Sequence, residues 1–175
     1  MKRLLFLMLI NIAKLSRILK NRNIYMKITR IAHQFNGVHF HGDPRYIHYN
    51  AYLDTSGKIE IGKKVVISTG VILLTHDYSF TVGLYSINEI PKTDISFVMS
   101  ISIGDNCFLG ANAIILPGTI IGSNVIIGAG SVVSGVVKDN TIIAGNPAKK
   151  IADLNEWIIR KKNTIPKEFF HIDKN

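Results

Sequence analysis

Residues 103–132 read IGDNCF LGANAI ILPGTI IGSNVI IGAGSV, which is five consecutive units of six residues. Each unit begins with Ile or Leu, has Asn or Gly at its fourth position, and has a small or β-branched residue at its fifth. Asn and Gly best tolerate a left-handed backbone conformation, so each unit should contain a corner. A period of six fits neither an amphipathic helix nor a series of hairpins. The pattern predicts one short strand in each unit and a corner between units.

Three such units would form one triangular coil of 18 residues, and successive coils would stack as a solenoid. The same phase appears upstream in residues 61–78 and lapses between Ser79 and Ser100. Because Leu73 and Ile103 are separated by a multiple of six, the solenoid should pause for an external loop and resume in register. Long loops of this kind are often functional. Strands about 4.8 Å apart should stack three aliphatic pairs: Ile103 on Ile121, Leu109 on Ile127 and Ile115 on Val133.

The 175 residues are enough for one domain with additions at both ends. We expect a basic amphipathic helical segment at 1–34, a β-helix at 35–151 with its loop at 79–100, and a C-terminal helix and tail at 152–175. Asp153 is a suitable N-cap for that last helix, which we expect to cover the open end of the solenoid.

The formal charge of +9 favours anionic partners. Many of the Lys and Arg residues lie before position 31 or after position 148, and the repetitive middle is nearly neutral, so we expect no nucleic-acid groove. A single cysteine, Cys107, cannot form an intramolecular disulfide, and this is typical of a cytoplasmic chain.

The N-terminal segment contains an apolar run, Leu4 to Ile10, that is too short to span a bilayer and is not followed by a signal-peptide cleavage pattern. Two interpretations remain open. The segment is a helix packed on the domain or on a neighbouring subunit, or residues 1–30 lie on an anionic membrane surface. The second interpretation would place a cytoplasmic protein at the inner face of the membrane.

Two further motifs follow in order, IGAGSVV at 127–133 and IAGNPAK at 143–149. With them, the chain from Tyr46 to Ile151 resembles the hexapeptide-repeat acyltransferases. The resemblance is to the branch that contains maltose and galactoside acetyltransferases and the O-acetyltransferases of bacterial surface polysaccharides. It implies an all-β, left-handed parallel β-helix that assembles as a homotrimer with active sites between subunits. It also implies acetyl-CoA as the acyl donor.

The resemblance places His76, in Thr75-His76-Asp77, at the position of the family's catalytic histidine. An imidazole can remove the proton of a hydroxyl as that hydroxyl attacks a thioester, so no acyl-enzyme is required. Asn50 matches the asparagine that binds the acceptor, and an amide can both donate and accept hydrogen bonds. Asp77 could orient the imidazole, bind the acceptor, or simply begin the loop.

The backbone N–H of Ala111 matches the family's donor to the developing oxyanion. The residues at cofactor-contact positions are small, aromatic or basic, and are Phe108, Ala129, Ser134, Lys149 and Lys150. The lysines could pair with the phosphates of the cofactor. Two positions depart from the family pattern, because Phe108 replaces a frequent tryptophan and Ala152 stands where a basic residue is common.

The resulting prediction is an acetyl-CoA-dependent O-acetyltransferase that acts on a hydroxyl of a sugar or a surface-polysaccharide precursor. Serine acetyltransferase, amino-sugar N-acetyltransferase and a non-catalytic β-helix scaffold are the alternatives. A metal-dependent enzyme on the same coil would need three converging histidines, and His76 has no companion histidine at a suitable spacing, so we expect no metal requirement.

Overall fold

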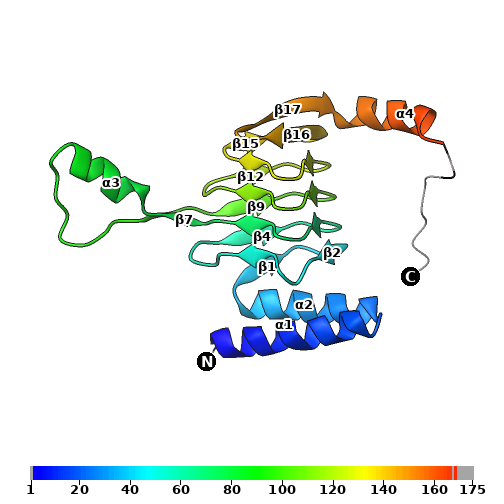
Figure 1. Cartoon of the computed structure of the whole chain (residues 1–175), viewed down its shortest axis with the longest axis horizontal. Helices are drawn as coiled ribbons and strands as arrows, with labels where there is room; N and C mark the ends of the chain where they lie inside the picture. Colours follow the sequence, from blue (N-terminus) through cyan, green and yellow to red (C-terminus); the bar gives the residue numbers. More distant parts are fainter. Residues whose placement is uncertain (1, 167, 169–175) are drawn as a thin grey trace.

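The computed structural model describes residues 2–166 and 168, so the end of the tail expected at 152–175 lies outside these residues. A stack of short strands rises from two helices at the N-terminal end, and the C-terminal helix lies at the opposite end (Figure 1). A long arm leaves the stack near its middle.

Three sheets form the three sides of the stack, and the chain visits them in the same order in every coil. Side A contains β1 (Val38–Phe40), β4 (Ile59–Ile61), β9 (Ile101–Ile103), β12 (Ile120–Ile121) and β15 (Val136–Val137). Side B contains β2 (Tyr46–Ile47), β5 (Val66–Ile67), β10 (Phe108–Leu109), β13 (Ile126–Ile127), β16 (Thr141–Gly145) and β17 (Ala148–Asp153). Side C contains β3 (Tyr52–Leu53), β6 (Ile72–Leu73), β11 (Ile114–Ile115) and β14 (Val132–Val133). The structure confirms the left-handed parallel β-helix with terminal helices.

The interior is the predicted ladder of aliphatic side chains. Three pairs have the expected register, namely Ile103 with Ile121, Leu109 with Ile127 and Ile115 with Val133. All six side chains are buried. The coils also resume in register after the external loop, since Ile61 pairs with Ile103 and Leu73 with Ile115.

The fourth position of each unit has the left-handed conformation that its residue type predicted. Backbone φ lies between 55° and 79° at all five of these positions: Asn106, Asn112, Gly118, Asn124 and Gly130. Stacked asparagines also join neighbouring coils between sides A and B, because Asn106 Nδ2 donates to Asn124 Oδ1 (2.9 Å) and Asn124 Nδ2 donates to Asn140 Oδ1 (3.1 Å).

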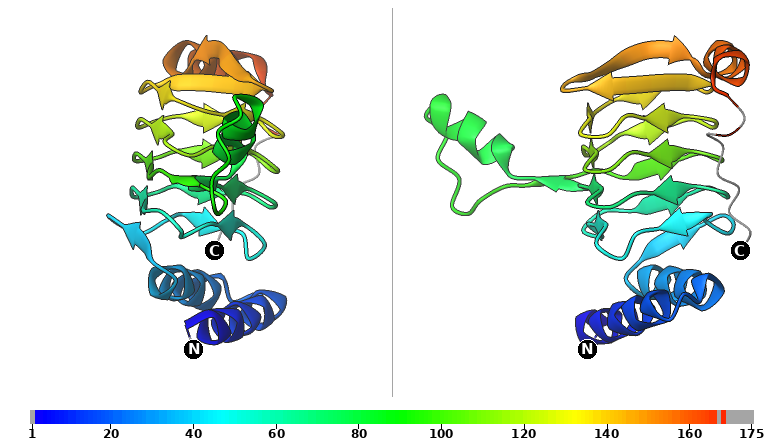
Figure 2. Two further views of the ribbon diagram at one scale, coloured as in Figure 1. Left: turned by 90° about the vertical axis from the view of Figure 1, so that its left-hand side faces the viewer. Right: turned by 45° about the vertical axis from the view of Figure 1, so that its right-hand side comes forward.

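The excursion between residues 79 and 100 is an ordered arm. Its base is a two-stranded antiparallel ribbon of β7 (His76–Asp77) and β8 (Phe97–Val98), and it carries helix α3 (Ser79–Ser86). The hydroxyl of Thr81 ties the helix to the segment that precedes β8 by donating to the Ile95 carbonyl (3.1 Å) and accepting from the Ile95 N–H (2.7 Å). Figure 2 shows the arm projecting away from the coils.

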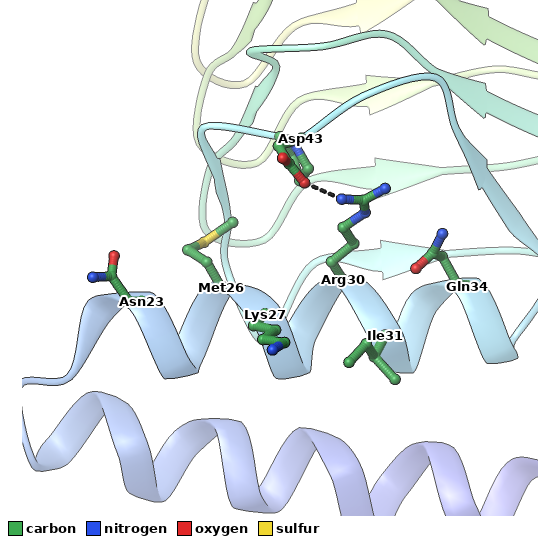
Figure 3. A pocket seen from close by; sticks show the side chains of 8 residues that line it. Asn23, Met26, Lys27, Arg30, Ile31, Gln34 and Asp43 are labelled. Atoms are coloured by element: carbon green, nitrogen blue, oxygen red, sulfur yellow. Dashed lines mark hydrogen bonds and ion pairs between the residues drawn. The ribbon is translucent and has the colours of Figure 1, made fainter.

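Two helices, α1 (Lys2–Ile18) and α2 (Arg22–Phe35), form a base below the first coil. Helix α1 packs against α2 at the N-terminal end of the stack (Figures 1 and 2), and its Lys14 and Arg17 reach Tyr49 of the first coil. The Tyr25 hydroxyl donates to the carbonyl of Ile47 (2.6 Å). Arg30 pairs with Asp43 in a pocket of about 620 Å³ between α2 and the first coil (Figure 3). None of the described helices is both long enough and apolar enough to cross a membrane.

At the other end, β17 folds back antiparallel on β16 and covers the edge of the last parallel strand. Helix α4 (Leu154–Thr164) then extends to one side (Figure 1), so the expectation that this helix covers the open end was wrong, because β17 pairs with the last strand there. Asp153 is its N-cap as predicted, because its carboxylate accepts from the N–H groups of Asn155 (2.9 Å) and Glu156 (3.3 Å).

Candidate active site

His76 lies at the corner between sides C and A, where the arm leaves the second coil. Its Nδ1 is 2.6 Å from Oδ2 of Asp54, and its side chain is 32% exposed. Its Nε2 has no hydrogen-bond partner within the part of the chain that the structure describes. The ring also meets Tyr78 edge to face, with the ring centroids 5.7 Å apart. One nitrogen is therefore held by a carboxylate, and the other is without a partner among the described residues on a partly exposed side chain.

Asp54 lies one coil below His76, just after β3 on side C, and is only 5% exposed. Its Oδ2 accepts from the N–H and hydroxyl of Thr75 (2.9 and 2.7 Å), and its Oδ1 accepts from the N–H and hydroxyl of Ser56 (3.0 and 2.7 Å). Burial alone would raise the pKa of this carboxyl, but the hydrogen bonds from Thr75, Ser56 and His76 hold the pKa well below its usual range. Asp54 is therefore ionised at neutral pH.

An ionised Asp54 has a direct consequence for the histidine. A carboxylate can only accept a hydrogen bond, so Nδ1 of His76 carries the proton and the lone pair of the neutral ring lies on Nε2. Carboxylate partners fix the tautomer and orientation of an imidazole in this way. The imidazole can therefore accept a proton from a hydroxyl that comes within hydrogen-bond reach of Nε2.

Asp77 lies next to His76 in sequence but makes a different contact. Its Oδ1 accepts from the N–H of Ser79 (2.6 Å) at the start of α3. This hydrogen bond lowers the pKa of the Asp77 carboxyl. Of the three roles that the sequence left open for Asp77, its described contacts are those of a residue that begins the arm. The carboxylate that orients the imidazole is Asp54, which sequence reasoning did not single out.

Asn50 lies at the other edge of side C, at the corner between sides B and C in the first coil. Its Oδ1 accepts from the N–H of Gly70 (3.0 Å) and the hydroxyl of Thr69 (3.1 Å), and it also contacts His48 Nδ1. A single chain therefore places Asn50 and His76 at two different corners of the triangle.

Ala111 lies at the same corner as Asn50, one coil above Thr69. Its carbonyl accepts from Gly130 N–H (2.8 Å), and its own N–H donates to none of the described groups. Ala129 follows at this corner in the next coil. Phe108 is 39% exposed on side B, where it lines a groove of about 560 Å³ that Trp157 of α4 also lines.

Ser134 and Lys150 come together although they are far apart in sequence. Both line a groove of about 430 Å³ beside the last coil, with Val136 and Lys138. Lys149 is exposed on β17 next to Lys150. The candidate cofactor residues therefore divide between the corner of Ala111 and Ala129, the groove of Ser134 and Lys150, and side B. The described residues contain no group of three His, Cys, Asp or Glu side chains that could hold a metal ion.

Comparison with known proteins places this geometry in a family. Residues 100–134 match the family described as the hexapeptide repeat of succinyl-transferase. WbbJ of Escherichia coli (strain K12), whose name assigns it to O-acetyl transfer in lipopolysaccharide biosynthesis, is 34% identical over 122 residues, which is 68% of this chain and 62% of WbbJ. The chain belongs to the hexapeptide-repeat acyltransferase family.

Solved structures of this family share the β-helix. A maltose O-acetyltransferase from Clostridium difficile 630 has a TM-score of 0.57 at 26% identity, with 86% of this chain and 88% of that chain covered. A galactoside acetyltransferase in complex with coenzyme A has a TM-score of 0.63 at 22% identity, with 98% and 88% covered, and this likeness concerns the fold. This hexapeptide-repeat protein spans between 52% and 62% of the length of WbbJ and of four other curated relatives that it matches.

Proposed function

We propose that the chain is an acetyl-CoA-dependent O-acetyltransferase that acetylates a hydroxyl of a sugar or a surface-polysaccharide precursor. The observation that carries the proposal is the His76–Asp54 pair, with a buried carboxylate on Nδ1 and an unpartnered Nε2 among the described residues. Family membership supports acyl transfer, and the name of WbbJ supports a saccharide acceptor. A location in the cytoplasm stays a prediction.

In the proposed reaction, Nε2 of His76 removes the proton of the acceptor hydroxyl as its oxygen attacks the thioester carbonyl. Asp54 stabilises the imidazolium that forms. The N–H of Ala111 donates to the oxyanion of the tetrahedral intermediate. As the carbon–sulfur bond breaks, the imidazolium returns the proton to the departing thiolate. The products are the acetyl ester and free CoA, and the histidine is regenerated without an acyl-enzyme.

The division of candidate residues between two corners supports a site formed by two subunits. Asn50 and Ala111 lie at one edge of side C and His76 lies at the other. In a cyclic homotrimer, the corner of one subunit can face a different corner of its neighbour. We propose that Asn50 and Ala111 of one subunit complete the site around His76 of the next. Asp77, at the base of the arm, is retained as a candidate acceptor ligand.

We also propose that the pantetheine arm of acetyl-CoA runs along the upper coils. Small side chains at Ala129 and Ser134 would permit its close approach, and Phe108 offers an exposed ring on side B. Lys149 and Lys150 would pair with the phosphates, because ammonium groups bind phosphate as point charges. The groove shared by Ser134 and Lys150 supports this placement.

The test measures free CoA released from acetyl-CoA with simple sugars, serine and nucleotide-linked amino sugars as acceptors. We expect acceptor-dependent turnover with a sugar, and a fall of about a hundred-fold or more in His76→Ala. His41→Ala is the matched control, because His41 also lies beside a carboxylate, Glu60, at 3.5 Å but at a different corner. We expect its turnover to match the wild type.

Three other results would contradict the proposed base or favour another function. Turnover that is equal in wild type and His76→Ala would remove His76 as the base. Turnover with serine or an amino sugar in place of a simple sugar would move the proposal to serine acetyltransferase or amino-sugar N-acetyltransferase. A chain that neither turns over nor binds CoA by calorimetry would favour a non-catalytic scaffold.

A further inference from the structure

The helical base presents an apolar face that no described part of the chain covers. Helix α1 packs on α2 through a side that contains Ile10, Ala13 and Ser16, which are buried. On the opposite side, large apolar side chains recur at helical spacing and are exposed: Leu4, Met8, Ile12, Leu15, Ile18 and, just past the end of the helix, Leu19. We call these six residues the outer face of α1.

The contacts of α1 determine which way the outer face points. Lys14 and Arg17 of α1 reach Tyr49 of the first coil, and the buried side of α1 packs on α2. The outer face lies on the opposite side of the helix, so it points away from the β-helix. Leu4, Ile18 and Leu19 are 75%, 76% and 72% exposed. A continuous apolar stripe of this kind marks an interaction surface, whereas single exposed apolar residues are ordinary.

Charge identifies the partner. Residues 1–42 contain eight Lys and Arg residues and no Asp or Glu, so nearly all of the net charge of +9 resides in the base. Lys2 and Arg3 at the start of α1 and Lys20 just after its end are exposed. Lys14 and Arg17 lie over the Tyr49 ring at 5.1 and 5.3 Å and fasten α1 to the first coil.

We propose that the outer face of α1 binds the surface of an anionic lipid bilayer, with the helix lying in the plane of the membrane. Its apolar side chains would enter the boundary between headgroups and acyl chains, while the basic residues at both ends meet the negative surface potential. A second copy of the chain is a poorer occupant. Two such bases face to face would bring together two positively charged segments that offer no acidic residue in either.

The experiment is flotation of the full chain with vesicles of pure phosphatidylcholine and with vesicles that also contain phosphatidylglycerol. We expect the protein to float with the anionic vesicles and to bind less as salt is raised. Replacing three outer-face residues in L4Q/I18Q/L19Q should lower the partition coefficient by about ten-fold or more. The matched control is V82Q/I87Q/I90Q, which removes three apolar side chains of similar exposure (70%, 62% and 77%) from the arm. The control should float like the wild type.

Four outcomes would overturn the proposal: no flotation of the wild type with anionic vesicles, equal flotation with neutral vesicles, equal flotation of L4Q/I18Q/L19Q and wild type, or equal losses in both triple variants. Thermal unfolding of each variant verifies that it is folded, which the exposure of the substituted side chains leads us to expect. Sedimentation without vesicles gives one further overturning result. A smaller assembly for L4Q/I18Q/L19Q than for the wild type would mean that a second copy covers the outer face.

Discussion

His33 in helix α2 should make the protein lose stability in mild acid. Its side chain is 1% exposed between the two helices of the base and meets the Phe6 ring edge to face at 5.3 Å. Neither ring nitrogen has a hydrogen-bond partner among the described residues. Burial lowers the pKa of His33 to about 4, because the charged ring would be left without water or a partner.

The size of the effect follows from the two pKa values. In the unfolded chain His33 takes up a proton near pH 6.5, whereas in the folded protein it does so only near pH 4. Between these values the unfolded state binds more protons, so the free energy of unfolding falls as the pH falls. The full loss is about 3 kcal/mol, of which about 2 kcal/mol should occur between pH 7 and pH 5.

Urea unfolding followed by far-ultraviolet circular dichroism at these two pH values measures the loss. The reference is His33→Leu, which places an apolar side chain of similar size at this position and removes two unsatisfied ring nitrogens. Because the two proteins differ only at position 33, the difference between their losses isolates the contribution of His33. We expect the wild type to lose about 2 kcal/mol more than the variant. Equal losses would refute the reasoning.

Two further predictions concern the site and the coils. Asp54→Asn should lower kcat by about a hundred-fold or more, because an amide no longer enforces the Nδ1–H tautomer of His76; the rate of CoA release measures this, and an equal fall in Asp105→Asn, whose carboxylate contacts Lys63 and not a histidine, would contradict it. Gly104→Ala should lower the free energy of unfolding by about 2 kcal/mol or more, because the new Cβ would lie 2.7 Å from the carbonyl carbon of Gly122 in the next coil. Gly83→Ala in α3, where a Cβ meets nothing within 4 Å, should instead raise it by about 0.5–1 kcal/mol, and urea unfolding that shows both alanines behaving alike would refute the close-packing argument.

The coils were predictable because the residue types within each unit of six indicate where its strand and its corner lie. Ile103 and its equivalents fill the interior, and Asn106 and its equivalents adopt the left-handed conformation, so neither depends on distant contacts. For the arm, the sequence predicted only its location, as an interruption of the six-residue repeat, and not its structure. A ribbon of two-residue strands has no periodic signal, and α3 is fastened by one threonine hydroxyl.

The partner of His76 could not be read from the repeat because the first coil is irregular. Counting back one ideal coil of 18 residues from His76 reaches Lys58, which is not an acceptor for an imidazole. In the structure Leu53 pairs with Leu73, an offset of 20 residues, so the carboxylate of Asp54 lies beneath Thr75 and reaches His76. The same contact explains why a buried carboxylate is tolerated there, since Thr75 and Ser56 satisfy its other hydrogen bonds. The histidine is therefore found by its motif, whereas its orientation is set by two residues that lengthen the coil below it.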